Sequence, residues 1–92
     1  MTIISKFNSD IFYSDYFKEM SSLCSNYKWK KYIIKNELIY RLNNKELIFR
    51  IINDIIQVSI PLKTSNYNYV TSFKNLDDSI KFGIKSIVYF NN

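Results

Sequence analysis

The sequence predicts one two-layer α+β domain over residues 1–92, in which a helix, a four- or five-stranded antiparallel β-meander and a second helix follow one another. Apolar residues recur at helical spacing near both ends of the chain, and the period changes to two between residues 29 and 73. Two short turns inside this middle stretch also agree on which face of the sheet is buried. We expect both helices to cover that face and to leave the other face open to solvent or a partner.

A first helix is expected over residues 9–26. Phe12, Tyr16, Met20 and Leu23 follow one another at spacings of four, four and three residues, and polar residues fill the opposite side. A stripe of this kind forms either a core face or a groove for a ligand or partner. We interpret it as a core face, because a chain of 92 residues needs most of its large apolar side chains to build one dense core.

Two asparagine-containing turns fix the register of the meander. With turns at Asn43-Asn44 and Asn53-Asp54, the middle strand presents the same face to both of its neighbours. The buried face then holds the pairs Leu38–Phe49, Tyr40–Leu47, Phe49–Val58, Leu47–Ile60 and Ile51–Ile56. The outer face holds the pairs Arg41–Glu46, Glu37–Arg50, Ile39–Ile48, Arg50–Gln57 and Ile48–Ser59. A shift of one residue would exchange the two faces, so the agreement between the turns supports this register.

The flanking strands follow from local signals. Residues 29–35 are expected to form the first strand, which turns at Lys35-Asn36, and residues 67–73 are expected to form the fifth. Pro61 ends regular pairing in the fourth strand because it has no N–H group to donate.

The last helix is expected to begin after Asn75, whose side chain can cap it, with Asp77 and Asp78 in the first turn. Its apolar stripe consists of Leu76, Ile80, Ile84, Ile87 and Val88. Gly83 lies within this helix, where it indicates either a close approach to the sheet or a chance occurrence.

Composition bears on the source and the compartment. The chain has no Ala, one Gly and one Pro, and it is rich in residues with A/T-rich codons, so we expect an AT-rich source. The single cysteine, Cys24, excludes an intramolecular disulfide framework. We see no secretory signal and no apolar run long enough to span a membrane, and therefore expect a cytoplasmic protein without membrane contact. The net charge of +5 mildly favours polyanions, although lysine-rich codon usage alone would raise it.

Catalytic and cofactor chemistry lack their usual residues. The absence of histidine removes a His base and His metal ligands, and one glycine is too few for a Gly-rich phosphate loop. We interpret Cys24 as a small buried hydrophobe, and Asp77 and Asp78 as charges that favour a helix N-terminus rather than as metal ligands. We thus expect no catalytic, cofactor-binding or metal-binding residue and no small-molecule substrate.

Two surfaces remain as candidates for function. The outer sheet face combines isoleucines with arginines and comprises Ile39, Arg41, Ile48, Arg50, Ile52, Ile55, Gln57 and Ser59. It predicts a protein-partner site, a homodimer seam or a contact with the N-terminal segment (Ile3, Ile4, Phe7), and codon-driven isoleucine excess is the alternative. The second surface is a basic run between residues 27 and 35 that contains Lys28, Trp29, Lys30, Lys31, Tyr32 and Lys35. Its lysines and aromatic rings suit single-stranded nucleic acid, and the alternative is an edge strand guarded by lysines with Trp29 in the core.

The sequence therefore favours a small non-catalytic module that binds a protein partner, or a second copy of itself, through the outer sheet face. An inhibitor or immunity-type protein of a mobile element, or of an AT-rich microbe or virus, fits the size and composition. The alternative is a nucleic-acid-binding module that uses residues 27–35.

Overall fold

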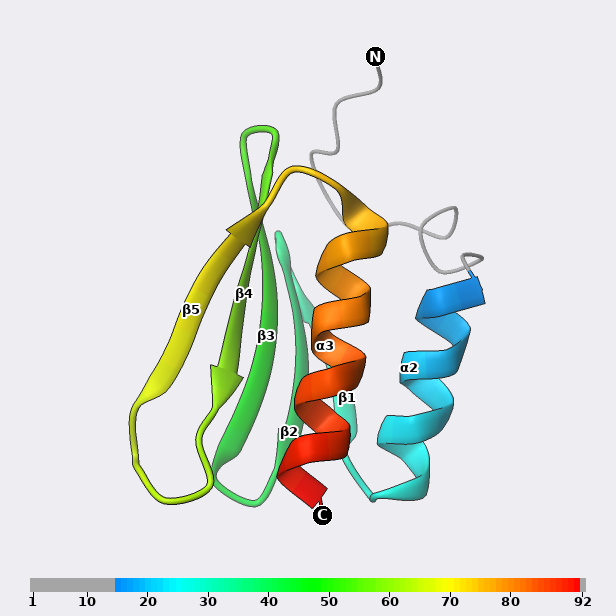
Figure 1. The fold of residues 1–92 in the computed structure, drawn as a ribbon, viewed down its shortest axis with the longest axis vertical. Coiled ribbons are helices and arrows are strands. Elements are labelled where there is room, and N and C mark those ends of the chain that lie inside the picture. The colour runs from blue at the N-terminus through cyan, green and yellow to red at the C-terminus, as the bar shows by residue number, and fades with distance from the viewer. Residues whose placement is uncertain (1–14, 92) are drawn as a thin grey trace.

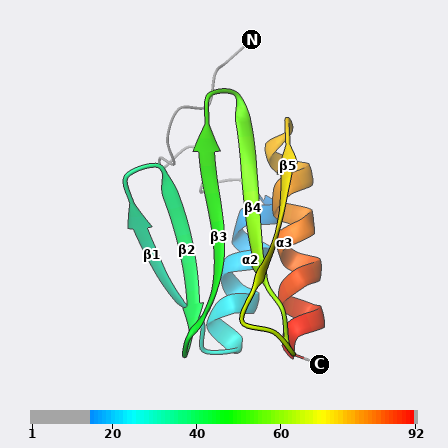
Figure 2. The same cartoon turned by 90° about the vertical axis from the view of Figure 1, so that its left-hand side faces the viewer.

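A computed structural model of the chain describes residues 15–91. Its elements, in order, are α2 (Asp15–Asn26), β1 (Lys30–Ile34), β2 (Glu37–Leu42), β3 (Lys45–Ile52), β4 (Ile55–Pro61), β5 (Asn68–Phe73) and α3 (Leu76–Asn91). The strands form one antiparallel sheet in the order β1-β2-β3-β4-β5. The two helices lie side by side (Figure 1), and a view turned by 90° places both on the same side of the sheet (Figure 2). The predicted α+β fold, with the helices on one face, is confirmed.

Parts of the sequence predictions fall outside the described residues. The predicted start of the first helix, over residues 9–14, is one of these, as is the contact of Ile3, Ile4 and Phe7 with the outer sheet face. Within residues 15–91, no helix is both long enough and apolar enough to cross a membrane.

The register of the meander is confirmed residue by residue. Every pair predicted from the turns at Asn43-Asn44 and Asn53-Asp54 is present in the sheet, apart from Leu47–Ile60, which β3 and β4 do not form as a ladder pair. Asn43 and Asn53 have φ angles of 56° and 55°, in the left-handed region that asparagine tolerates better than most residues. The turn between β1 and β2 puts Lys35 in the same conformation, with φ of 54°.

The core lies between the helices and the inner face of the sheet. Residues from both helices and from β2, β3 and β4 form one buried cluster in the described chain, which includes Met20, Leu38, Leu47, Phe49, Val58, Ile80 and Ile87. Gly83 is where α3 approaches the sheet most tightly, since a Cβ atom there would lie 2.6 Å from Cζ of Phe49. The close approach is thus the correct interpretation of the glycine. The hydroxyl groups of Ser21 and Tyr40 share a hydrogen bond of 2.9 Å that joins α2 to β2.

Side chains and main-chain groups define the helix ends. The amide N–H of Asp78 donates to Oδ1 of Asn75 over 3.1 Å, so Asn75 is the predicted cap of α3. At the end of α2, the N–H groups of Lys28 and Trp29 donate to the carbonyls of Ser25 and Cys24 at 3.0 and 2.8 Å. This pair of hydrogen bonds is a Schellman motif, and Lys28 takes its left-handed position with φ of 70°.

Trp29 follows this motif directly and enters the core. Its ring packs edge-on against Phe90 of α3, with ring centroids 5.3 Å apart, and only 5% of the residue is exposed. Its Nε1–H group has no acceptor within the described part of the chain, so packing alone holds the ring. The alternative in which Trp29 belongs to the core is therefore the one that the structure supports.

Candidate binding surfaces

The outer face of the sheet is organised in rows that run across the strands. The register aligns Tyr32, Ile39, Ile48, Ser59 and Val70 as one row over all five strands. The centre of this row is closed, because Ile39 lies between Tyr32 and Ile48 and only 6% of it is exposed. Ile48 is half-buried and Ser59 is buried. The expectation that Ile39 and Ser59 are open to a partner is therefore wrong for the side chains as they stand.

A charged row lies on one side of this central row. Nε of Arg50 donates to Oε2 of Glu37 over 2.7 Å, and its Nη1 donates to Oε1 of Gln57 over 2.9 Å. The three residues face one another on β2, β3 and β4, so one guanidinium joins three strands. This predicted Glu37–Arg50 pair is confirmed.

A second charged row lies on the other side of the central row. Nε of Arg41 donates to Oε2 of Glu46 over 2.7 Å, and this hydrogen bond raises the pKa of Arg41 further above its usual range. The same guanidinium lies over the ring of Tyr32, with its Cζ atom 5.0 Å from the ring centroid. One face of Tyr32 is therefore already occupied by a cation.

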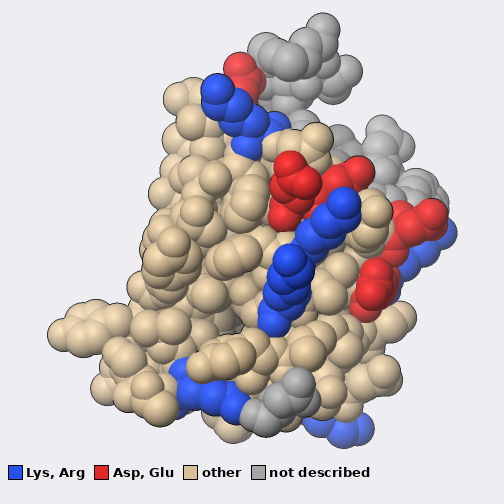
Figure 3. All heavy atoms as spheres, in the orientation of Figure 1, with Lys and Arg blue, Asp and Glu red and all other residues tan. Residues whose placement is uncertain are grey.

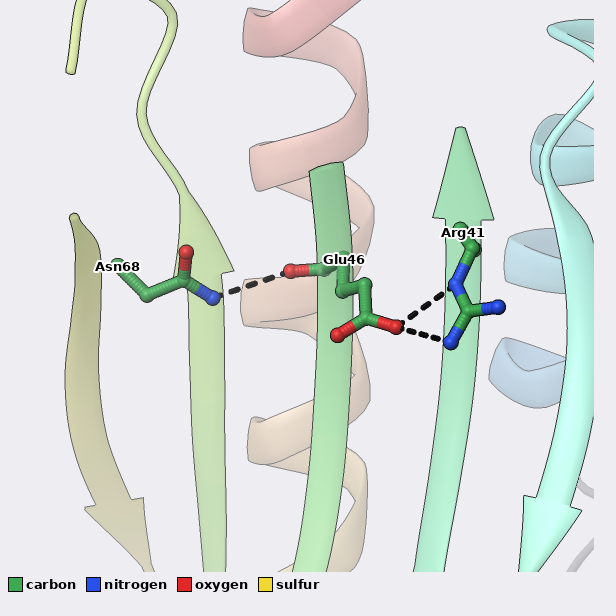
Figure 4. A network of polar contacts seen from close by, with 3 residues as sticks. All are labelled: Arg41, Glu46 and Asn68. Carbon is green, nitrogen blue, oxygen red and sulfur yellow. Dashed lines mark hydrogen bonds and ion pairs between the residues drawn. The ribbon is translucent and has the colours of Figure 1, made fainter. Parts of the chain in front are cut away.

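Asn68 completes this second row from β5. Continuing the β3–β4 register by two residues sets Glu46 opposite Pro61, which has no N–H group to offer the Glu46 carbonyl. Nδ2 of Asn68 supplies the missing donor over 3.1 Å and also donates to Oγ of Ser59 over 2.8 Å. Figure 4 shows the Asn68 side chain reaching past β4 to Glu46, which in turn holds Arg41. Sequence reasoning missed this contact, although a proline directly after the last expected pair, Leu47–Ile60, was a signal for it.

Exposed aliphatic side chains gather at one end of the outer face. Ile34 on β1 is 53% exposed, and Ile52 and Ile55, which face each other across the β3–β4 hairpin, are also exposed. An open depression of about 580 Å³ lies between the β1–β2 and β3–β4 turns. We call it the hairpin notch, and its lining includes Ile34, Lys35, Glu37, Arg50, Ile52 and Asn53.

The opposite end of the outer face carries a basic depression of about 400 Å³. It is lined by Lys28, Lys30, Tyr32, Arg41, Leu42 and Asn43, which include three cations and no carboxylate. Arg41 was assigned to the outer face and the lysines to the basic run, and the fold brings the two sets together here. Lys28 reaches this place through the Schellman motif, whose left-handed position holds this lysine where a glycine is usual.

The basic run from residues 27 to 35 is divided by the fold. Lys28, Lys30 and Tyr32 line the basic depression, and Lys35 lines the hairpin notch. Lys31 lies on the opposite face of β1, because neighbouring residues of a strand alternate. Trp29 is buried, which removes the ring that was expected to stack on a base.

Cys24 and the two aspartates Asp77 and Asp78 are the remaining groups considered in the sequence. Cys24 is buried on α2, and burial raises the pKa of its thiol to about 12, which keeps it protonated and unreactive near neutral pH. Asp77 and Asp78 occupy the first turn of α3. In residues 15–91, no group of three Cys, Asp or Glu side chains has the arrangement of a metal site.

Comparison of the chain with protein-family models, with curated proteins and with solved structures finds no match in any of the three.

Proposed function

We propose that the chain is a non-catalytic module that binds another protein through the outer sheet face, with the hairpin notch as the centre of the contact. The observation that carries this proposal is an open depression lined by the exposed side chains of Ile34 and Ile52, with exposed Ile55 facing Ile52 across the β3–β4 hairpin. Full burial of an aliphatic side chain of this size contributes about 1.5–3 kcal/mol, so two or three of them can anchor a partner.

The polar groups beside the notch also favour a protein contact. Arg50 already has hydrogen bonds to Glu37 and Gln57, so a covering partner need not supply a new acceptor for each of its donors. Lys35 has no ion-pair partner in the described part of the chain. The notch therefore suits a segment that places an apolar side chain against the isoleucines and a carboxylate beside Lys35.

The backbone of Lys35 supports a role for its charge. Lys35 has a left-handed φ of 54°, whereas the equivalent positions of the other two turns carry Asn43 and Asn53. The left-handed backbone conformation costs a lysine more free energy than an asparagine, and strained backbone positions are frequent at functional sites. Lysine and asparagine codons both begin with AA, so an AT-rich gene favours neither residue. We infer that the positive charge is retained for binding.

Nucleic-acid binding is the second candidate, and the basic depression is the observation that favours it. Single-stranded nucleic acid is held by cations together with aromatic rings that stack on bases. In this chain Trp29 is buried and Tyr32 has Arg41 over one face, so the cations are present with little ring surface. The structure therefore offers more support for binding of a protein than for binding of a nucleic acid.

An affinity-capture experiment from native lysate, with and without nuclease, tests the proposal. The tagged wild-type chain should retain a protein in stoichiometric amount after nuclease treatment. The I52D/I55D double variant should lose it. Both side chains are already about half buried, so each contributes roughly half of the value for full burial, and two such anchors correspond to an affinity loss of roughly 10-fold or more. The matched control is V88D, which places a similar charge at an exposed aliphatic position on α3.

Each of three results would count against the outer-face proposal. The captured protein could survive the I52D/I55D change, or V88D could release it to the same extent. Recovery of nucleic acid alone, lost steeply as salt is raised, would favour the basic depression instead. An inhibitor or immunity-type role is a narrower form of the proposal, and loss of the captured protein's own activity in the complex would support it.

A further inference from the structure

The two edge strands of the sheet differ in charge. β1 contains Lys30 and Lys31, and Lys28 and Lys35 flank it. β5 reads Asn-Tyr-Val-Thr-Ser-Phe from residue 68 to residue 73 and contains no charged residue. An edge strand exposes unpaired main-chain N–H and C=O groups, which can pair with a strand of another molecule. Proteins usually prevent such pairing with lysine or proline on the edge strand or with a covering element. β1 therefore carries charges that oppose strand pairing, whereas β5 has no charge within the strand and a single lysine, Lys74, directly after it.

The side chains around β5 form a continuous uncharged patch. Tyr67 is 80% exposed, and Tyr69 and Val70 are about half exposed. Phe82 of α3 lies beside the strand, with its ring centroid 6.5 Å from that of Tyr69. Tyr89 is exposed two helical turns further along α3, where Nζ of Lys63 lies 5.5 Å from its ring centroid and ends the uncharged patch. Figure 3 shows this side of the molecule, over β5 and the adjoining flank of α3, as a broad area without charged atoms between charged side chains at its upper and lower ends.

The residues of β5 are also arranged symmetrically about Val70. Aromatic residues occupy positions 67 and 73, and small polar residues occupy positions 68 and 72. Tyr69 and Thr71, both strand-forming residues, stand on either side of the centre. A strand with this pattern is complementary to itself when a second copy runs in the opposite direction.

We propose that two copies of the chain pair through β5 about a two-fold axis at Val70, which joins their sheets into one. The pairs across the axis are Val70–Val70, Tyr69–Thr71, Asn68–Ser72 and Tyr67–Phe73. Opposite residues of an antiparallel pair lie on the same face, so Val70 meets Val70, Tyr67 meets Phe73 and Asn68 meets Ser72, while Tyr69 meets the β-branched Thr71. The two outer faces then lie on the same side of the joined sheet, and each dimer carries two hairpin notches.

Charge explains why the second copy joins at β5. Pairing of β1 with another β1 about its centre would set Lys30 and Lys31 opposite Ile34 and Ile33 and would place four lysines in one seam, whereas β5 brings together no charged side chain between residues 68 and 73. The association buries uncharged groups, so the dimer should persist when the salt concentration is raised.

Sedimentation velocity of the full chain tests the proposal at concentrations up to about 1 mM. The wild type should approach twice the chain mass of 11.1 kDa, in low and in high salt. V70K should be a monomer, because two lysines would face each other at the axis. The matched control is I33K, an aliphatic residue on the other edge strand with 46% exposure against 49% for Val70, and it should remain a dimer.

A second variant protects the test against misfolding. S72K adds a charge to an exposed position of β5 that is already polar, and it should weaken the dimer while circular dichroism stays unchanged. The proposal is overturned if the wild type is a monomer throughout the range, or if I33K dissociates the dimer and V70K does not. V70K should still capture the protein partner, and I52D/I55D should still dimerise. The two variants therefore distinguish a failure of the dimer proposal from a failure of the proposed function.

Discussion

Replacing Gly83 by alanine has two opposing effects on stability: it raises helix propensity and it creates a steric clash in the core. Alanine stabilises a helix interior by about 1 kcal/mol relative to glycine, which alone would favour the substitution. At this position the new Cβ would lie 2.6 Å from Cζ of Phe49 and 3.0 Å from Sδ of Met20. The Met20 side chain can shift, but the Phe49 ring is enclosed in the core with 1% of the residue exposed. Overpacking of this kind costs about 1–3 kcal/mol.

We therefore expect the clash to exceed the propensity gain, with G83A losing up to roughly 2 kcal/mol of stability. For a domain of this size, each kcal/mol lowers the melting temperature by roughly 4–8 °C. Urea titration and thermal melting followed by circular dichroism measure both quantities. K85A, at an exposed position of the same helix, is the matched control and should change stability little.

A double-mutant cycle identifies the cause. F49L removes the ring atom nearest to the new Cβ, so G83A should be neutral or stabilising in that background. The difference between the two backgrounds should be roughly 1–3 kcal/mol, as is usual for residues in contact. The reasoning is refuted if G83A raises the melting temperature of the wild type, or if it has the same effect in both backgrounds.

Three further predictions follow from single contacts. K35N should raise stability by about 1 kcal/mol in urea titration because asparagine tolerates the left-handed backbone, while it weakens partner capture; lower stability would contradict the strain argument. N68A should lower stability by about 0.5–1.5 kcal/mol because the Glu46 carbonyl and the Ser59 hydroxyl lose a donor, and a change near zero would mean that water replaces the amide. Burial raises the pKa of Cys24 from 9.0 to about 12 and also raises that of Tyr40. Both groups hold their protons more tightly in the folded state than in the unfolded state. Their contribution to the free energy of unfolding is therefore complete below about pH 9 and is lost as the pH rises towards 12. Unfolding midpoints should therefore fall over this interval, and C24A should show a smaller fall; an equal fall in C24A would assign the effect to other groups.

The two proposals concern different parts of the surface and have a common consequence. If the chain dimerises through β5, both hairpin notches face the same direction, and a partner with two copies of the binding segment is held more tightly than one with a single copy. V70K then lowers the affinity for a bivalent partner and leaves the affinity for a monovalent one unchanged.

The sheet register was predictable because its signals are local. A two-residue turn fixes which residues face each other, and the alternation of side chains then decides the face of every residue in the hairpin. The same holds for the start of α3, where Asn75 and the two aspartates act within one helical turn. The basic and aliphatic candidate surfaces could be named on this basis.

The full set of residues in each candidate binding surface could not be predicted from the sequence. The basic depression joins Lys28, at the end of α2, to Arg41 on β2, and nothing in the local pattern predicts that lysine occupies the left-handed position of a Schellman motif. The burial of Trp29 depends on the position of Phe90 in α3, which is more than 60 residues away in sequence. The use of Asn68 as a donor for Glu46 arises only because β4 and β5 lie side by side after Pro61.

The sequence by itself determined the α+β fold, the order of the elements, the pairing of the strands and the division of the sheet into a buried and an outer face, because periodicity and turn chemistry act over a few residues. The tertiary structure decided which outer residues are accessible. Ile39 and Trp29 are buried by their neighbours, and Ile34 and Ile52 line the hairpin notch with exposed Ile55 beside it. β5 is the edge strand that contains no charged residue. Accessibility depends on which distant side chains pack beside a residue, and that information exists only once the chain has folded.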